Sequence, residues 1–295
     1  MNIAQNIPHI QFNAPNSDNF GFEVVPIEKI ARSKDAYDHD PEQPHQLKFY
    51  NLIVFTEGKG RHFIDFHWYP VQQNSIVYLT KDQVNAFEFS DRLKGYCIIF
   101  TEAYFVRCFS HLPEDFVFRL FNPQLFSPIL QIPKDSDFTP YFDLLRKESE
   151  TGSGFNQKTI VESLFVILIS KAEAIKQSQT FHIKSSTKIR FFHAFTTLME
   201  QHISKSRSAD FYARELGVTY KHLNSICKEL LNKTAKHVID DYVILLAKRS
   251  LINSSLKSSE LAYTLGFEDP TNFTKYFKQK TGFTPKEFKS SLLEK

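Results

Sequence analysis

The chain has 295 residues, which suggests two domains, and its hydrophobic fraction of 42% is ample for packed cores. The net charge of +3 is unevenly placed, because the part from Ser186 onward has 18 Lys and Arg against 11 Asp and Glu. A basic C-terminal part after an acidic N-terminal part predicts that only the former faces a polyanion. The longest apolar run, near 164–169, is too short for a membrane span, and the N-terminus lacks the form of a signal peptide. We therefore expect a soluble, cytoplasmic protein.

Short β-rich runs separated by turn signals dominate residues 46–100. The predicted strands are 49–55, 62–69, 75–79, 86–89 and 95–100, with an earlier short strand at 22–27. Strands of this length and spacing predict a small antiparallel barrel or sandwich. On the run 62–69, the alternating face that we expect to point inward holds His62, Ile64, Phe66 and Trp68.

After residue 101 the pattern becomes helical, with apolar residues at helical spacing in 138–150 and 157–176. The second of these helices has a broad apolar stripe around Ile160, Leu164 and Ile167, which predicts packing against a partner chain or against the protein's own barrel. The polar residues 177–187 predict a linker. We place the domains at 1–180 and 188–295, with the linker at 181–187.

The last quarter of the chain contains one helix–turn–helix pattern written twice. Lys228 and Lys278 lie fifty positions apart, as do Thr234 and Thr284. In the first copy Gly217 stands where a tight turn needs a positive φ, and Thr219 is the predicted cap of the second helix. The second copy repeats this scheme, with Asp269 as the predicted cap. Two such units in series favour the reading of two neighbouring stretches of one DNA face, and a plain helical bundle with solvated lysines is the alternative.

The predicted core positions are Ala213, Leu216, Val218, Leu223, Ile226 and Leu230 in the first copy and Leu261, Ala262, Leu265, Phe267, Phe273 and Phe277 in the second. Once these positions are buried, the helical period fixes an exposed face on the second helix of each copy. Lysine there can donate to guanine or phosphate, asparagine can pair with adenine, and threonine offers a methyl group to thymine. The candidate DNA-binding residues are Lys221, Asn224, Ser225, Lys228, Pro270, Thr271, Asn272, Lys275 and Lys278.

Residues 189–288 resemble the DNA-binding domain of the AraC/XylS family of bacterial transcription regulators. The stretch that carries this resemblance most strongly is Leu265-Gly266-Phe267-Glu268-Asp269-Pro270-Thr271-Asn272-Phe273, followed by Phe277-Lys278 and Thr281-Gly282-Phe283-Thr284-Pro285. The resemblance implies a seven-helix, all-α domain with two helix-turn-helix units joined by a linker helix over about 235–251. It implies base contacts from Lys221 and Ser225 in one major groove and from Pro270, Thr271 and Lys275 in the next.

Four positions depart from the family pattern. Cys227 replaces a usual phenylalanine, and Asn232 stands where glycine is usual, although asparagine tolerates the left-handed conformation. Tyr242 and Leu246 occupy linker-helix positions where an arginine and a glutamate are common. We therefore expect a usual ion pair across that helix to be missing, and the second copy to be the better packed of the two.

Residues 47–100 look similar to the cupin-like sensor barrels fused to many family members, which implies a mainly-β cupin-like barrel with added helices. The resemblance implies a transcription regulator, more often an activator, that responds to a small-molecule effector, forms a homodimer and engages RNA polymerase. The candidate ligand-binding residues are His45, Tyr50, His62, Ile64, Phe66 and Trp68.

Two other interpretations of the N-terminal half stay open. It could only dimerise or bind a protein partner, with its aromatic residues serving as core. It could also be a metal-dependent cupin enzyme, if His45, His62 and Glu88 met in space. The sequence has no nucleophile elbow, phosphate loop or acid pair, so we expect no catalytic residue, no metal and no cofactor.

Overall fold

The computed structural model describes residues 8–12, 21–32, 40–90, 92–112, 118–150, 156–180, 186–253 and 257–293. The chain divides into two compact units, one formed by Pro8–His182 and the other containing Ile183–Lys295. Most of the linker expected at 181–187 lies outside the described residues. No helix in the described ranges is both long enough and apolar enough to span a membrane.

The N-terminal unit contains two five-stranded sheets. The first has the order β1 (His9–Ile10), β3 (His45–Leu47), β8 (Val84–Phe87), β5 (Lys59–Ile64), β6 (His67–Gln72). The second has the order β10 (Ile129–Gln131), β7 (Ser75–Leu79), β4 (Tyr50–Glu57), β9 (Lys94–Phe100), β2 (Phe22–Pro26). Alternation along β4 places Ile53 and Phe55 in the core between the sheets and Leu52 and Val54 in a second core on the opposite face.

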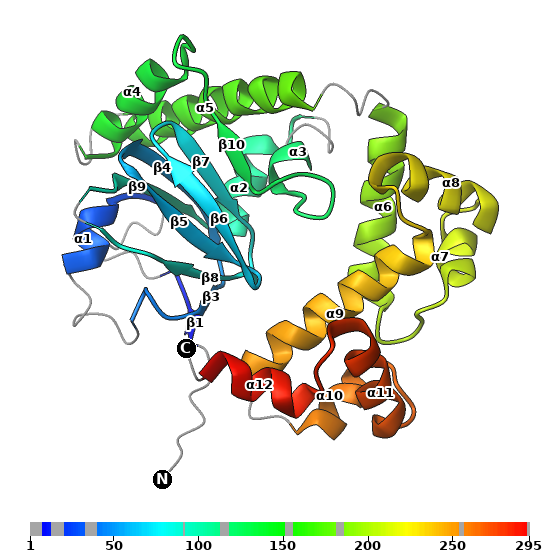
Figure 1. Ribbon diagram of the computed structural model, residues 1–295. Coiled ribbons are helices and arrows are strands. Elements are labelled where there is room, and N and C mark those ends of the chain that lie inside the picture. Colours follow the sequence, from blue (N-terminus) through cyan, green and yellow to red (C-terminus); the bar gives the residue numbers. More distant parts are fainter. Residues whose placement is uncertain are drawn as a thin grey trace. The chain divides into compact units, whose positions relative to one another are not determined.

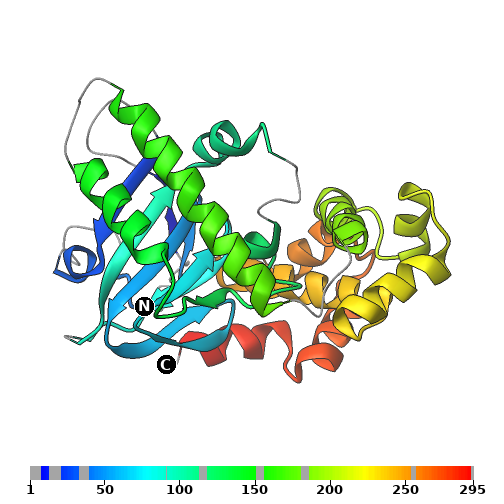
Figure 2. The ribbon, with the colours of Figure 1, turned by 90° about the horizontal axis from the view of Figure 1, so that it is seen from above.

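Helices cover that opposite face of the second sheet. They are α2 (Glu102–Phe109), α3 (Phe118–Phe121), α4 (Phe138–Glu150) and α5 (Gln157–Gln179), while α1 (Ile27–Arg32) follows β2. Helix α5 crosses the strands with α4 beside it (Figure 1 and Figure 2). Phe165 and Leu168 of α5 share one buried cluster with Leu52 and Phe100 of the sheet. The expected mainly-β domain with added helices is therefore confirmed.

The strand predicted at 62–69 is wrong, because the chain reverses in its middle. Asp65 and Phe66 have φ values of 43° and 73°, and they form the turn between β5 and β6. The Asp65 carboxylate holds this turn against β8 by accepting hydrogen bonds from the Gln83 side chain at 2.8 Å and from the Val84 N–H at 3.2 Å. Reversal breaks the expected alternation. His62 and Ile64 point inward as predicted, but Trp68 is 46% exposed.

Seven helices build the described part of the C-terminal unit. They are α6 (Ser186–His202), α7 (Ala209–Glu215), α8 (Tyr220–Leu231), α9 (Ala235–Asn253), α10 (Ser258–Thr264), α11 (Pro270–Thr281) and α12 (Pro285–Leu293). Helices α7 and α8 form one helix-turn-helix unit, α10 and α11 form the other, and α9 runs between them (Figure 1). The expected all-α domain with two units and a linker helix is confirmed.

The two copies differ in how well they are packed, as the sequence suggested. In the first copy the predicted core positions Leu216, Val218 and Leu230 are only half-buried. In the second copy every predicted core position is buried, namely Leu261, Ala262, Leu265, Phe267, Phe273 and Phe277. Phe267 and Phe273 pack with ring centroids 5.2 Å apart, whereas Val218 holds the place of Phe267 in the first copy. The larger aromatic residues fill the second turn more completely.

Candidate nucleic-acid interface

The two recognition helices, α8 and α11, begin in the same way. The Thr219 hydroxyl accepts a hydrogen bond from the His222 N–H at 3.2 Å. In the second copy the Asp269 carboxylate accepts from the Thr271 N–H at 2.7 Å, and Pro270 takes the first helical position, where its missing N–H costs nothing. Both helices therefore start at the residues that the sequence predicted as caps.

The two recognition helices also end in the same way. Asn232 and Gly282 adopt left-handed conformations, with φ values of 54° and 83°, and each N–H bonds to the carbonyl of the lysine four residues earlier. Asparagine thus fills the place that glycine fills in the other copy, because its short side chain tolerates this backbone region.

Equivalent positions of the two recognition helices present polar side chains to solvent. We define the reading face as the exposed residues Lys221, Ser225, Lys228, Thr271, Asn272, Lys275 and Lys278. A spacing of fifty residues relates Lys221 to Thr271, Ser225 to Lys275, and Lys228 to Lys278. Each pair Lys221/Ser225 and Thr271/Lys275 is four apart on its helix and so points in one direction. Pro270 is half-buried at the start of this face.

Asn224 differs from the other candidate DNA-binding residues. Its side chain is half-buried, and its Oδ1 accepts a hydrogen bond from the Ala235 N–H at 3.0 Å. That bond satisfies one of the free N–H groups at the start of α9. Asn224 therefore connects the first recognition helix to the linker helix, which the helical period alone does not reveal.

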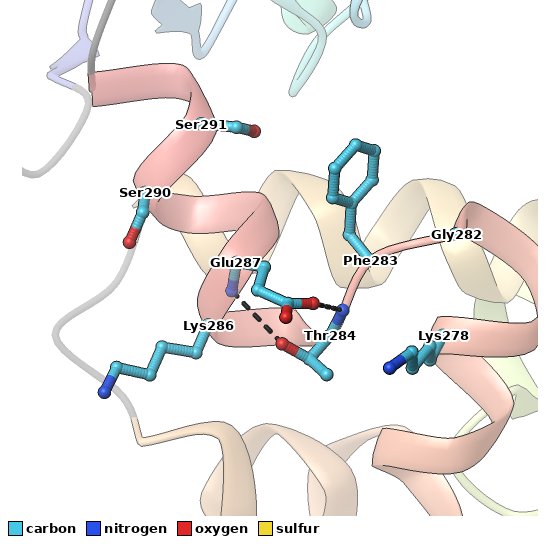
Figure 3. A pocket seen from close by; sticks show the side chains of 8 residues that line it. All are labelled: Lys278, Gly282, Phe283, Thr284, Lys286, Glu287, Ser290 and Ser291. Atoms are coloured by element: carbon cyan, nitrogen blue, oxygen red, sulfur yellow. Dashed lines mark hydrogen bonds between the residues drawn. The ribbon is translucent and has the colours of Figure 1, made fainter.

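Matching hollows lie at the ends of the two recognition helices. The first is lined by Lys228, Asn232, Lys233, Thr234, His237 and Asp241. The second is lined by Lys278, Gly282, Phe283, Thr284, Lys286, Glu287, Ser290 and Ser291, as Figure 3 shows. Thr234 and Thr284 cap the helices that follow, and Glu287 completes a reciprocal cap by accepting from the Thr284 N–H at 2.7 Å. The fifty-residue spacing of Thr234 and Thr284 is the pattern in the sequence that corresponds to these two matching helix starts.

In the N-terminal unit, His45, His62 and Ile64 are buried between the sheets, with exposed fractions of 3%, 1% and 2%. Burial, and then the neighbouring His45, lower the pKa of His62 to about 3, so its ring stays neutral. Among the buried polar atoms of this interior, His62 Nε2, Asn51 Oδ1 and Asn85 Oδ1 form no hydrogen bond of good geometry within the described residues. His62 makes a weaker polar contact with Asn85, and Asn51 makes one with Cys97. Sequence reasoning missed Asn51 and Asn85, although both stand as polar residues inside apolar strands.

The other candidate ligand-binding residues lie elsewhere. Tyr50 stacks on Phe100 and Phe105 at centroid distances of 5.5 and 5.4 Å, on the face that the helices cover. Phe66 is half-buried in the hairpin turn, and the exposed Trp68 ring lies 4.9 Å from the Arg61 guanidinium. The structure therefore brings together three of the six candidates and not the other three.

The residues suggested for a metal site do not converge. Glu88 forms an ion pair with Arg61 at the surface, while His45 and His62 are buried. Across the described residues, no group of three or more His, Cys, Asp or Glu side chains is arranged to hold a metal ion.

Comparison with known proteins agrees with this division of the chain. Residues 212–291 match the family described as a helix-turn-helix domain, and residues 27–159 match the AraC-like ligand binding domain. The chain is 23% identical over 249 residues to the Msm operon regulatory protein of Streptococcus mutans, covering 82% of this chain and 84% of that protein. It is 18% identical over 264 residues to the transcriptional activator RhaS of Escherichia fergusonii, covering 84% and 87%.

A solved structure to which the chain is similar is that of ToxT from Vibrio cholerae with a bound unsaturated fatty acid. It has a TM-score of 0.46 and 16% identity, covering 94% of this chain and 97% of that one.

A ligand-binding domain joined to a double helix-turn-helix domain defines a sequence-specific DNA-binding transcription regulator. The chain belongs to the AraC family of such regulators.

Proposed function

We propose that one subunit of this regulator reads two successive major grooves, with α8 in the first and α11 in the second. The observation that carries this proposal is the reading face, where equivalent positions on two helices with the same start and the same end are all exposed. Lys221 and Ser225 would contact bases in the first groove, and Pro270, Thr271 and Lys275 in the second.

Phosphate contacts would come from the ends of the same helices. Lys228 and Lys278 lie beside the hollows in which α9 and α12 begin, and a lysine near a helix N-terminus suits a phosphate group. Asn272 is exposed and free to contribute. Asn224 would reach DNA only through its amide nitrogen, because its oxygen bonds to the Ala235 N–H.

We also propose that the N-terminal unit binds an uncharged, hydrogen-bonding small molecule between its sheets, next to His45, His62 and Ile64. The support is the cluster of buried polar side chains His62, Asn51 and Asn85, whose Nε2 and Oδ1 atoms form no hydrogen bond of good geometry. A buried polar atom left unsatisfied costs about 1–3 kcal/mol, so a hydrogen-bonding ligand would be stabilised there. The proposed site omits Tyr50, which lies on the opposite face of its sheet, Phe66, which lies in the β5–β6 turn, and Trp68, which is exposed.

Self-association of the regulator would use the outer face of α5. Val161, Phe165 and Leu168 bury the inner face of this helix, whereas Ile160 and Ile167 are 42% and 37% exposed. Exposed isoleucines on a helix that is already packed favour a second copy of the chain as partner. The names of relatives such as RhaS support activation of transcription. We propose RNA polymerase as the partner in activation, as the family resemblance implies.

Selection of binding sites from a random-sequence duplex library tests the DNA-reading proposal. Purified wild-type protein should enrich two short blocks about 10 base pairs apart for each subunit. Enrichment of a single block per subunit, or of no sequence, would contradict it. A thermal-shift screen of neutral metabolites tests the ligand proposal, because a true effector should stabilise the wild-type protein and lose that effect in a His62→Phe variant.

The alternative, an N-terminal unit that only dimerises, differs from the proposal in the first of two results, because both accounts include self-association through α5. No metabolite would then stabilise the protein, and an Ile160→Glu/Ile167→Glu variant would become a monomer in size-exclusion chromatography. A stabilising metabolite would exclude this alternative whatever the oligomeric state.

A further inference from the structure

Asp240 of the linker helix connects that helix to the second recognition helix. Its Oδ1 accepts a hydrogen bond from the Tyr276 hydroxyl at 2.9 Å, and its Oδ2 lies 2.8 Å from Lys280 Nζ. Tyr276 and Lys280 are four apart on α11, so both point toward α9 from one side. We call these three residues the Asp240 tie. Lys236, four residues earlier on α9, adds a further bond at 2.5 Å to Oδ1.

The Asp240 tie contains a buried charge, so its hydrogen-bonding distances must be kept. The Asp240 side chain is only 7% exposed. Burial by itself would raise the pKa of Asp240, but the hydrogen bonds from Lys236, Lys280 and Tyr276 hold it below its ordinary value. A buried carboxylate is tolerated only when its partners stand at hydrogen-bonding distance, so movement of α11 along or around α9 would leave a charge unpaired.

A second link reaches the same place from the first helix-turn-helix unit. Arg207, which precedes α7, donates to the Gly266 carbonyl at 3.2 Å, and its guanidinium lies 3.5 Å from the centre of the Phe267 ring. The Phe267 ring in turn packs 5.3 Å from the Tyr276 ring. Residues from α9, from α11 and from the segment before α7 therefore meet around Tyr276.

The first helix-turn-helix unit can be compared with the second to show what the Asp240 tie adds. The positions of α8 that are equivalent to Tyr276 and Lys280 hold Ile226 and Leu230, which pack as apolar side chains. A helix-turn-helix unit of this fold therefore forms without a buried carboxylate of this kind, although Asn224 gives the first unit one neutral hydrogen bond to α9. Apolar packing is non-directional, whereas charge-assisted hydrogen bonds to one carboxylate depend on both the axial position and the rotation of α11.

We infer that Asp240 is a positioning residue that sets the spacing between the two DNA blocks this regulator accepts. The first recognition helix leads through Asn232 directly into α9, and the Asp240 tie then fixes α11 on α9. The distance and angle between the two reading helices thus depend on α9, on the Asp240 carboxylate and on the Arg207 link described above. This inference rests on the proposed reading of DNA by both helices.

The test compares three full-length proteins in selections from a random-sequence duplex library. They are the wild-type protein, Asp240→Asn, and Asp241→Asn as the matched control. Asp241 is the next residue of α9 but is exposed, and it pairs with Lys233 at 2.7 Å rather than with α11. Because Asp241 lines the first hollow, the control is its distribution of spacings and not its overall affinity for DNA. The readout is the distribution of spacings between the two enriched blocks, followed by affinities for duplexes at the best spacing and one base pair either side.

We expect a single spacing for the wild-type protein and for Asp241→Asn, and a spread over neighbouring spacings for Asp240→Asn. The preference for the best spacing over its neighbours should fall on the order of tenfold in Asp240→Asn. A merely structural role for Asp240 would weaken binding at all spacings equally and leave the distribution sharp, and that result would overturn the inference.

Two further variants keep the test decisive if Asp240→Asn folds poorly. Tyr276→Phe and Lys280→Met each remove one bond of the tie from the α11 side, and circular dichroism would confirm that each is folded. Both should broaden the spacing distribution, and a sharp distribution in both would overturn the inference. Failure of the wild-type protein to enrich two blocks would instead refute the proposed function, so the two failures are distinguishable.

Discussion

Gly217 and Gly266 share a left-handed backbone, with φ values of 68° and 75°, but only Gly266 lies against another part of the chain. A Cβ atom at position 266 would stand 2.5 Å from the Ser204 carbonyl oxygen, whereas one at 217 would meet nothing within 4 Å. At Gly217 only the positive φ favours glycine. At Gly266 both the positive φ and the close approach of the Ser204 backbone favour it.

Alanine at these two glycines should therefore have unequal effects. Gly217→Ala should lower the free energy of unfolding by roughly 1–2 kcal/mol, the cost of a left-handed alanine. Gly266→Ala should cost on the order of 2 kcal/mol more, because the backbone of Ser204 must move. Urea unfolding followed by circular dichroism measures both values, and equal losses would contradict the difference in packing.

Lys275 and Lys228 should differ in what their removal changes. Lys275→Ala should cost about 1–3 kcal/mol on the selected site and relax the preference at one base, since its position faces the groove. Lys228→Ala should weaken all sequences alike and lower the slope of log affinity against log salt by about one unit. Binding titrations on matched and mismatched duplexes at several salt concentrations measure both effects. A uniform loss for Lys275→Ala would make it a phosphate contact.

Lys176 predicts a pH dependence of stability in the N-terminal unit. Its Nζ donates to the carbonyl oxygens of Ser127 and Ile129 at 2.7 and 3.2 Å, and burial lowers its pKa from 10.5 to about 8. Between these values the unfolded chain binds more protons than the folded protein, so stability should rise as the pH is raised from 8 toward 10.5, by up to roughly 3 kcal/mol. Lys176→Met should remove this rise.

Unfolding measured through Trp68, the sole tryptophan, reports on the N-terminal unit. A slope in that pH range that persists in Lys176→Met would show that another group causes it.

The buried His62 leads to a prediction of how the stability of the N-terminal unit changes at acidic pH. Its pKa is lowered from 6.5 to about 3, chiefly by burial, so the unfolded chain takes up a proton in this range that the folded protein refuses. Stability without effector should fall by about 2 kcal/mol between pH 6.5 and pH 5 because of this residue. His62→Asn should lose less over that interval, and His67→Asn, at an exposed position of the same hairpin, should behave like the wild-type protein.

The sequence predicted the features that depend on residues close together in the chain. The caps at Thr219 and Asp269 and the left-handed Asn232 follow from local backbone chemistry, and the apolar period located the helices of both copies. The reversal at Asp65 escaped prediction because Asp-Phe is not a usual turn pair, and hydrogen bonds from β8 hold it. Asp240 escaped because its partner Tyr276 lies 36 positions away, beyond the reach of any helical period.

Hydroxyl-radical footprinting of the full-length protein on a selected duplex tests the central claim most directly, namely that one chain reads DNA with two recognition helices. We predict two protected blocks per subunit, centred about 10 base pairs apart on one side of the duplex. Lys275→Ala should weaken protection of one block and leave the other in place. A single protected block per subunit, unchanged by substitutions on α11, would contradict the account.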